Sequence, residues 1–95
     1  MAYYLIQQLF QPGEILICDS ILSRGFKFLP FLKRHFSGDW GDISEYDRSC
    51  NDQSLADNSD ILSQYEATDA HHTTEFITIV TSADRSYTIV FLPDD

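Results

Sequence analysis

The sequence predicts an α+β fold in which an N-terminal strand and short helices pack on a C-terminal antiparallel β-meander. Helix-capping and turn signals occupy residues 1–57, whereas the β-rich runs "DILSQYEA", "TEFITIVTS" and "RSYTIVFLP" fill the last third. The chain has 95 residues, of which 43% are hydrophobic, enough for one small core. We therefore expect a single domain over residues 1–95.

The first third is predicted to contain a strand followed by two helices. The apolar segment "YYLIQQLF" and the turn signal "QPG" precede "EILIC", which has the length and composition of a strand. Asp19 or Ser20 is expected to cap a short helix that ends at Gly25. A second helix is predicted from Pro30 to about Phe36, with Gly38 as its stop. Its predicted core stripe is Leu29, Leu32 and Phe36.

A third helix is predicted from Glu45 to about Ala56. The Ser44 side chain is expected to cap it, and Asp47 can reach back to the Ser44 amide. Its apolar stripe is narrow and consists of Ile43, Tyr46, Cys50 and Leu55. Asn51 lies on the core-facing side, where its amide is predicted to satisfy loop backbone groups.

The meander is predicted from alternating side chains. In the middle run, Phe76, Thr78 and Val80 alternate with Ile77, Ile79 and Thr81. Asp84 and Arg85 fall at a hairpin turn, where an aspartate commonly accepts hydrogen bonds from backbone amides. We expect Arg85 to form an ion pair with Asp39, Asp42 or Asp47.

The charge is unevenly distributed along the chain. The net charge is −9, and residues 38–95 contain thirteen acids but only two bases, Arg48 and Arg85. The negative electrostatic potential of this half opposes direct binding to nucleic acid or to an anionic membrane and favours a partner with a basic surface. No run is long enough for a membrane span, no secretory signal is evident, and Cys18 and Cys50 lack metal or redox spacing. A cytoplasmic location is expected.

The stretch "GDWGD" and the histidine before it have structural and functional readings. His35 is expected to bond the terminal carbonyls of the second helix or to stack on Trp40. Trp40 is expected to plug one end of the core, with Gly38 and Gly41 supplying unusual backbone conformations. The alternative is an exposed Trp40 that anchors a partner.

No metal, cofactor or catalytic motif is evident. The acids of "GDWGDISEYD" do not match the spacing of a calcium loop, and His71 and His72 have no partner pair. No nucleophile elbow, phosphate loop or zinc-protease motif occurs. We therefore expect no bound metal or cofactor and no enzymatic activity. The alternative kept open is a small enzyme or metal-dependent site built on His35, Asp39, Asp42 and Asp47.

Several motifs occur in a characteristic order. They are "RH-x-x-GDWGD" from Arg34, "E-x-D-R-x-x-ND" from Glu45, "ILS-x-Y" from Ile61, "T-x-ADRS-x-T" from Thr81 and "LP" at Leu92. Over residues 14–93 this order resembles a family of small bacterial proteins found on plasmids and other mobile elements. The chain departs from the family pattern at Ser82, where a glutamate is usual, and in the longer segment "EATDAHHTTEF". The resemblance implies a mobile-element protein but no specific activity.

The leading hypothesis is a non-enzymatic interaction protein. Its acidic second half would bind a basic surface, such as that of a nucleic-acid-binding protein, by imitating nucleic acid. The candidate surface consists of Asp39, Trp40, Asp42, Glu45, Asp52, Asp57 and Asp60. The residues assigned to structure are His35, Gly38, Gly41, Ser44, Asp47, Asn51, Asp84 and Arg85.

Overall fold

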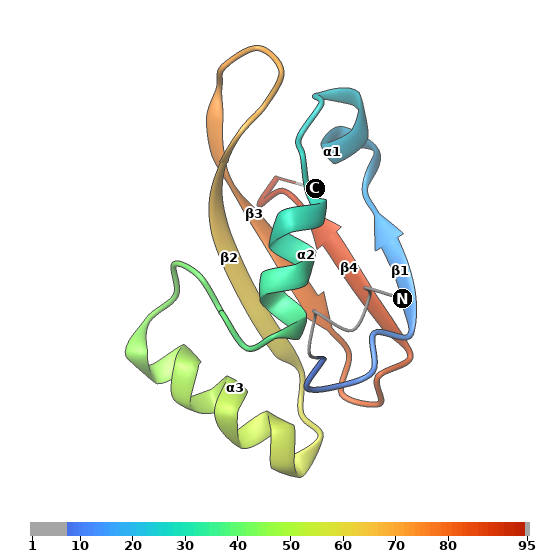
Figure 1. Ribbon diagram of the computed structural model, residues 1–95, viewed down its shortest axis with the longest axis vertical. Helices are drawn as coiled ribbons and strands as arrows, with labels where there is room; N and C mark the ends of the chain where they lie inside the picture. The colour runs from blue at the N-terminus through green and yellow to red at the C-terminus, as the bar shows by residue number, and fades with distance from the viewer. Residues whose placement is uncertain (1–7, 95) are drawn as a thin grey trace, which may run out of the picture.

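Four strands form one mixed sheet with the order β1-β4-β3-β2 in a computed structural model that describes residues 8–94 (Figure 1). The strands are β1 (Glu14–Ile17), β2 (Ile61–Thr68), β3 (Thr74–Thr81) and β4 (Tyr87–Phe91). The helices are α1 (Asp19–Ser23), α2 (Leu29–Phe36) and α3 (Glu45–Asp57). This α+β architecture, with β2, β3 and β4 in an antiparallel meander, confirms the predicted fold class. Residues 1–7, which include most of the apolar segment "YYLIQQLF", lie outside the described residues.

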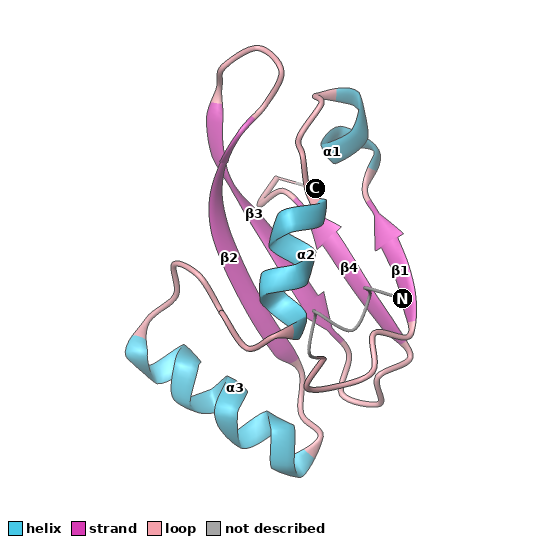
Figure 2. Ribbon diagram, in the orientation of Figure 1, coloured by secondary structure: helices cyan, strands magenta, loops and turns pink. Residues whose placement is uncertain are grey.

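The first strand joins the sheet in parallel to the last. Glu14 to Ile17 pair in register with Tyr87 to Val90. The helices α1 and α2 follow β1, and α2 crosses one face of the sheet (Figure 2). That face carries the core, which includes Ile21 of α1, Leu32 and Phe36 of α2, and Ile77 and Ile79 of β3. No described helix has the length and apolarity needed to cross a membrane.

Two details of the first helices differ from the prediction. Cys18 is the N-cap of α1, and Asp19 and Ser20 lie in the first turn instead. Leu29 is 60% exposed, because it begins α2 beside Phe28 and Pro30 at a surface hollow rather than over the sheet. Leu32 and Phe36 are buried as predicted, and Gly38 ends the helix with φ +90°.

The third helix contacts the sheet differently from the prediction. The Ser44 side chain caps it by accepting a hydrogen bond from the Asp47 amide at 3.1 Å, as predicted. The expected apolar stripe is not buried, since Tyr46 is 77% exposed and Cys50 is also exposed. Instead, the buried residues of α3 are the polar Asn51 and Ser54. The reason is position: α3 lies beside the edge of β2, where the sheet offers backbone polar groups rather than apolar side chains (Figure 1).

The outer edge of β2 is covered by hydrogen bonds from the segment 40–51. Asn51 donates to the Leu62 carbonyl at 2.5 Å and accepts from the Leu62 amide at 3.0 Å. Gln64 donates to the Trp40 carbonyl at 3.2 Å and accepts from the Asp42 amide at 2.6 Å. An uncovered edge strand invites pairing with other chains. The predicted role of Asn51 is thus correct in kind, but the backbone groups that it satisfies belong to a strand rather than a loop.

Replacing Asn51 with alanine should destabilise the protein by about 2 kcal/mol, because the Leu62 amide and carbonyl both lose their partner. Hydrogen exchange at the Leu62 amide should become faster in the same variant. The matched control is Gln53→Ala on the exposed side of α3, which should change the free energy of unfolding by less than about 0.5 kcal/mol. Equal effects of the two changes in chemical denaturation would refute this role for Asn51.

Candidate functional site

The "GDWGD" segment links α2 to the sheet edge. Trp40 is 3% exposed and its indole N–H donates to the Asp52 carboxylate at 3.3 Å, so it plugs the core as predicted. The burial removes Trp40 from the predicted exposed surface. Gly41 has φ +76°, and a Cβ at this position would lie 2.2 Å from the Gln64 carbonyl oxygen, so glycine is required here.

The two aspartates of this segment have different partners. The Arg34 guanidinium donates to Asp39 at 2.7 Å and holds the pKa of that carboxyl below its ordinary value. The Asp42 carboxylate accepts from the Glu66 amide at 3.3 Å and so covers a further position of the β2 edge. Asp39 is therefore neutralised by a cation of α2, an ion pair that the sequence analysis did not predict.

His35 is fully buried, with 0% exposure. Its Nδ1 lies 2.5 Å from the Ser63 hydroxyl and its Nε2 lies 2.9 Å from the Thr81 hydroxyl. Its ring also contacts Trp40 edge to face at 6.0 Å between centroids. The contact with Trp40 was predicted. The predicted hydrogen bonds from His35 to the terminal carbonyls of α2 are wrong, because the ring points into the sheet and contacts the hydroxyls of Ser63 and Thr81.

The direction of this hydrogen-bond chain can be derived from its far end. Thr81 Oγ1 lies 2.7 Å from Thr88 Oγ1, which donates to the Pro12 carbonyl at 2.7 Å. A carbonyl only accepts, so the single Thr88 proton is used there, and Thr81 must donate to Thr88. His35 Nε2 must in turn donate to Thr81, and Nδ1 accepts from Ser63. The ring is thus a neutral imidazole with its proton on Nε2.

Arg85 binds the end of α3 rather than an aspartate. It donates to the carbonyls of Ser54 at 2.9 Å and Ser59 at 2.7 Å, and its guanidinium lies over the Phe10 ring. The predicted ion pair with Asp39, Asp42 or Asp47 is wrong. Those acids lie toward the N-terminal end of α3, whereas Arg85 reaches the C-terminal end, where the helix dipole favours a cation. The neighbouring Asp84 accepts from the Ser86 amide at 2.9 Å, which confirms its predicted turn role.

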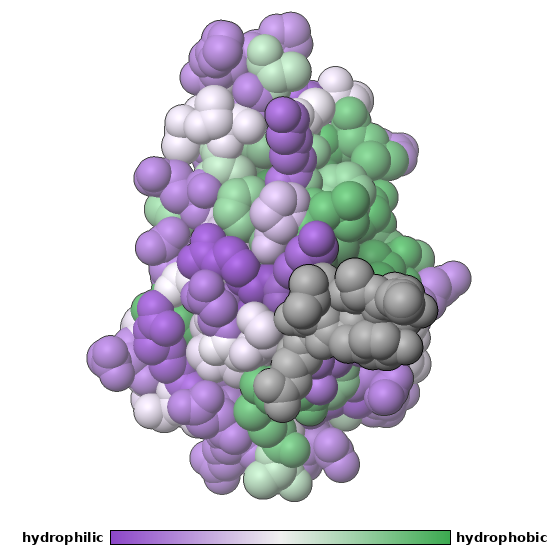
Figure 3. Space-filling model, viewed as in Figure 1, coloured by the Kyte–Doolittle hydropathy of each residue, from purple (hydrophilic) through white to green (hydrophobic). Residues whose placement is uncertain are grey.

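Exposed acids gather on α3 and the loops at its ends. They are Asp42, Glu45, Asp52, Asp57 and Asp60. The ion pairs within residues 8–94 are Arg24 with Asp69, Arg24 with Glu75, and Arg34 with Asp39, so none involves these five. The cation of this helix, Arg48, donates to the Gly41 carbonyl. Figure 3 shows hydrophilic side chains over this region. We call it the acidic α3 surface.

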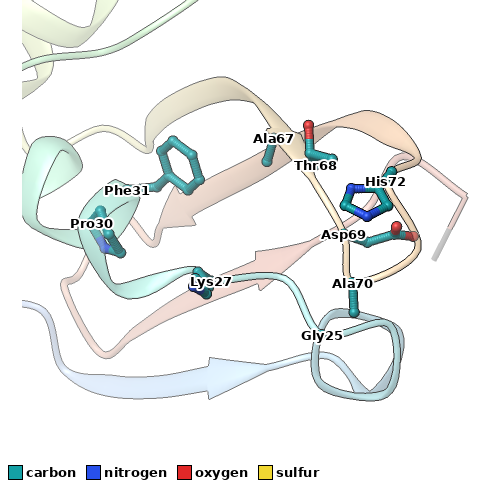
Figure 4. Close-up of a pocket in the computed structure, with 9 residues that line it drawn as sticks. All are labelled: Gly25, Lys27, Pro30, Phe31, Ala67, Thr68, Asp69, Ala70 and His72. Carbon is teal, nitrogen blue, oxygen red and sulfur yellow. The ribbon is translucent and has the colours of Figure 1, made fainter.

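A cavity of about 490 Å³ lies elsewhere, between the α1–α2 loop and the β2–β3 hairpin. Phe31 of α2 borders it on one side and His72 of the hairpin on the other (Figure 4). Asp69 in its wall is paired with Arg24 at 2.8 Å. Hydrogen bonds from Thr73, Arg24 and His71 lower the pKa of Asp69. The sequence analysis did not predict this cavity, which forms only when the hairpin folds back to the α1–α2 loop.

The four residues of the alternative enzyme site do not meet in any cavity described among residues 8–94. His35 is enclosed by Ser63 and Thr81, Asp39 is paired with Arg34, and none of the four lines a described pocket. Over residues 8–94, no three His, Cys, Asp or Glu side chains are arranged to hold a metal ion. The geometry thus gives the enzyme alternative no support at these positions.

Comparisons with models of protein families, with curated proteins and with solved structures find no match to this chain. The acidic α3 surface must therefore be interpreted from its own chemistry.

The buried imidazole predicts a pH dependence of stability. Burial lowers the pKa of His35 to about 3, against about 6.5 in the unfolded chain. Between these values the unfolded state binds a proton that the folded state excludes, so stability should fall as the pH drops below about 6.5. The slope should approach 1.4 kcal/mol per pH unit, roughly one proton.

The window between pH 5 and 6.5 isolates this effect, because the carboxyls with lowered pKa, Asp39, Asp69 and Asp84, begin to lose their stabilisation only below about pH 5. Chemical denaturation across this window should show the slope in the wild type. His35→Gln should flatten it whatever its absolute stability. An unchanged slope in this variant would contradict the assignment.

Replacing Arg85 with alanine should lower the melting temperature, by about 5 °C for a loss near 1 kcal/mol in a domain of this size. The cause is the loss of donors to the Ser54 and Ser59 carbonyls. Arg85→Lys keeps the charge but not the fork of donors, so it should recover part of the loss. A melting temperature of Arg85→Ala equal to that of the wild type would show that these bonds do not hold the end of α3.

Proposed function

We propose that this protein is a non-enzymatic interaction protein whose acidic α3 surface binds a basic surface on a partner protein. The observation that carries the proposal is the way α3 is attached. The helix is held by hydrogen bonds through Asn51, Ser54 and Arg85, so its other sides remain exposed and free to carry charge. A helix anchored by an apolar stripe would have to bury that stripe.

The spacing of the acids bears on what the surface imitates. The thirteen residues of α3 span about 20 Å, and three acids of the acidic α3 surface lie on them, Glu45, Asp52 and Asp57. This gives one acid per roughly 7 Å, which is nearer to the 3.4 Å between phosphates along one nucleic-acid strand than to the 1.7 Å between charges along a duplex. The proposed partner is therefore a protein with a basic groove for a single strand.

This proposal narrows the surface predicted from the sequence. Trp40 is excluded by its burial and Asp39 is neutralised by Arg34. Asp42, Glu45, Asp52, Asp57 and Asp60 remain as exposed carboxylates on α3 and the loops at its ends. Three of them also serve the fold, because Asp42 accepts from the Glu66 amide, Asp52 from Trp40 and Asp57 from Ser59. Glu45 and Asp60 are thus the positions to change first.

The test is capture of a partner from a bacterial extract on the immobilised protein, followed by elution with salt. The bound protein should be released between about 0.1 and 0.5 M salt and displaced by single-stranded DNA more readily than by duplex. The double variant Glu45→Gln, Asp60→Asn should weaken the interaction about tenfold at low salt. A complex that resists both salt and DNA would refute nucleic-acid imitation.

The matched control is the double variant Asp19→Asn, Asp94→Asn, which removes the same net charge outside α3. It should bind nearly as tightly as the wild type. Equal weakening by the two double variants would mean that net charge, and not the acidic α3 surface, attracts the partner.

A further inference from the structure

The second face of the sheet carries an apolar row between polar side chains, and no described helix covers it. Side chains alternate across a strand, so the residues between those of the core point to this face. Leu16, Ile89, Val80 and Leu62 are in register on the four strands and form one aliphatic row across the whole sheet. Three aromatic residues flank the row, Phe76, Tyr87 and Phe91. We call these seven residues the open sheet face.

The exposure of these side chains shows that the face is accessible. Leu16 is 39% exposed, and Phe76 and Tyr87 are each 41% exposed. The helices α1 and α2 pack on the opposite face, where the buried cluster lies (Figure 2). Soluble proteins rarely expose an apolar patch of this kind unless it is a contact surface.

The charges around the face restrict its occupant. The face contains two acids at diagonally opposite corners. Glu14 of β1 lies beside Tyr87 of β4, and Glu66 of β2 lies beside Phe76 of β3. A basic partner would be drawn to the acidic α3 surface instead. The occupant of the open sheet face must therefore be flat, with an apolar centre and no charge opposite Glu14 or Glu66, and the open sheet face of another copy has this pattern when its corners are offset.

The size of the face fits a modest self-association. The twenty-five strand residues cover about 400 Å² in projection, at about 3.3 Å per residue and 4.8 Å between strands. Two such faces bury about 800 Å² by this measure, and corrugation by the side chains adds to it. Specific interfaces begin near 1,000 Å² of total buried area, so the complex would be weak and dependent on concentration.

We propose that two copies of this chain associate through their open sheet faces. A two-fold axis parallel to the strands places β1 of one copy over β2 of the other. The two α3 helices then lie at opposite ends of the dimer, which separates the densest negative charge of two chains that each carry −9. Neither Glu14 nor Glu66 faces its counterpart in this arrangement. Face-to-face sheets in sandwiches pack about 10 Å apart in this way.

The test is sedimentation equilibrium of the whole chain from about 10 µM to 1 mM, which covers the affinities expected of a small interface. A dimer should appear over this range, and added salt should strengthen it by screening the repulsion between the two chains. The interaction through the acidic α3 surface should instead weaken with salt, so the two proposals can fail separately. A monomer at 1 mM in about 0.5 M salt would overturn the proposal.

The variant Phe76→Lys, Tyr87→Lys changes two exposed residues of the face and should weaken association at least about tenfold while the protein stays folded. The control Leu22→Lys, Leu29→Lys makes the same change at exposed leucines of α1 and α2 and should not weaken it. Circular dichroism checks that both variants fold. A dimer that is weakened equally by both, or by neither, would overturn the proposed face.

Chemical shifts recorded against concentration locate the contact within the folded chain. The shifts should move at Leu62, Val80 and Ile89 along the row. Changes confined to Ile15 and Ile17 would show pairing through the outer edge of β1 and would reject face-to-face packing. Loss of partner capture in the Phe76→Lys, Tyr87→Lys variant would assign the face to that partner instead of a second copy.

Discussion

The buried imidazole of His35 holds together the parts of the molecule on which its surfaces depend. It joins α2 to β2 through Ser63 and to β3 through Thr81, and the chain continues through Thr88 of β4 to the Pro12 carbonyl before β1. Each hydroxyl in the chain donates once, so every donor is satisfied without water. Such a network has one arrangement of protons, and it fixes the position of α2 on the sheet more specifically than apolar packing alone.

The position of α2 determines where the next segment runs. Because α2 ends at Gly38 beside the sheet, "GDWGD" must pass along the outer edge of β2, where Trp40 and Asp42 bond the backbone of Gln64. Asn51, eleven residues before Leu62 in the chain, continues the same coverage. The edge that would invite unwanted pairing is therefore closed by a loop and a helix, and the acids of α3 are placed outside it as a consequence.

Local patterns in the sequence were sufficient to predict the fold class, the three helices and the meander, since capping residues, glycines and alternation act over a few positions. They failed where distant segments meet. The partner of Arg85 was wrong because the end of α3 is brought to the hairpin only by the complete fold. On the polar contact face of α3, Asn51 was predicted but Ser54 was missed, because helical periodicity assumes apolar burial, whereas a strand edge presents amides and carbonyls. The pairing of Arg34 with Asp39 was also missed, although five residues separate them.

The small number of apolar side chains explains why the surface has one acidic part and one apolar part. In a chain of 95 residues the apolar side chains suffice for one layer of helices over one face of the sheet. Attaching α3 by hydrogen bonds leaves that helix free to be acidic, but it also means that no helix among residues 8–94 covers the second face, where the apolar row remains exposed. The acidic α3 surface and the open sheet face thus have a common origin in the attachment of α3. The opposite responses to salt that we expect follow from their chemistry. The contact through the acidic α3 surface depends on attraction between opposite charges, whereas the contact through the open sheet face depends on burial of apolar side chains.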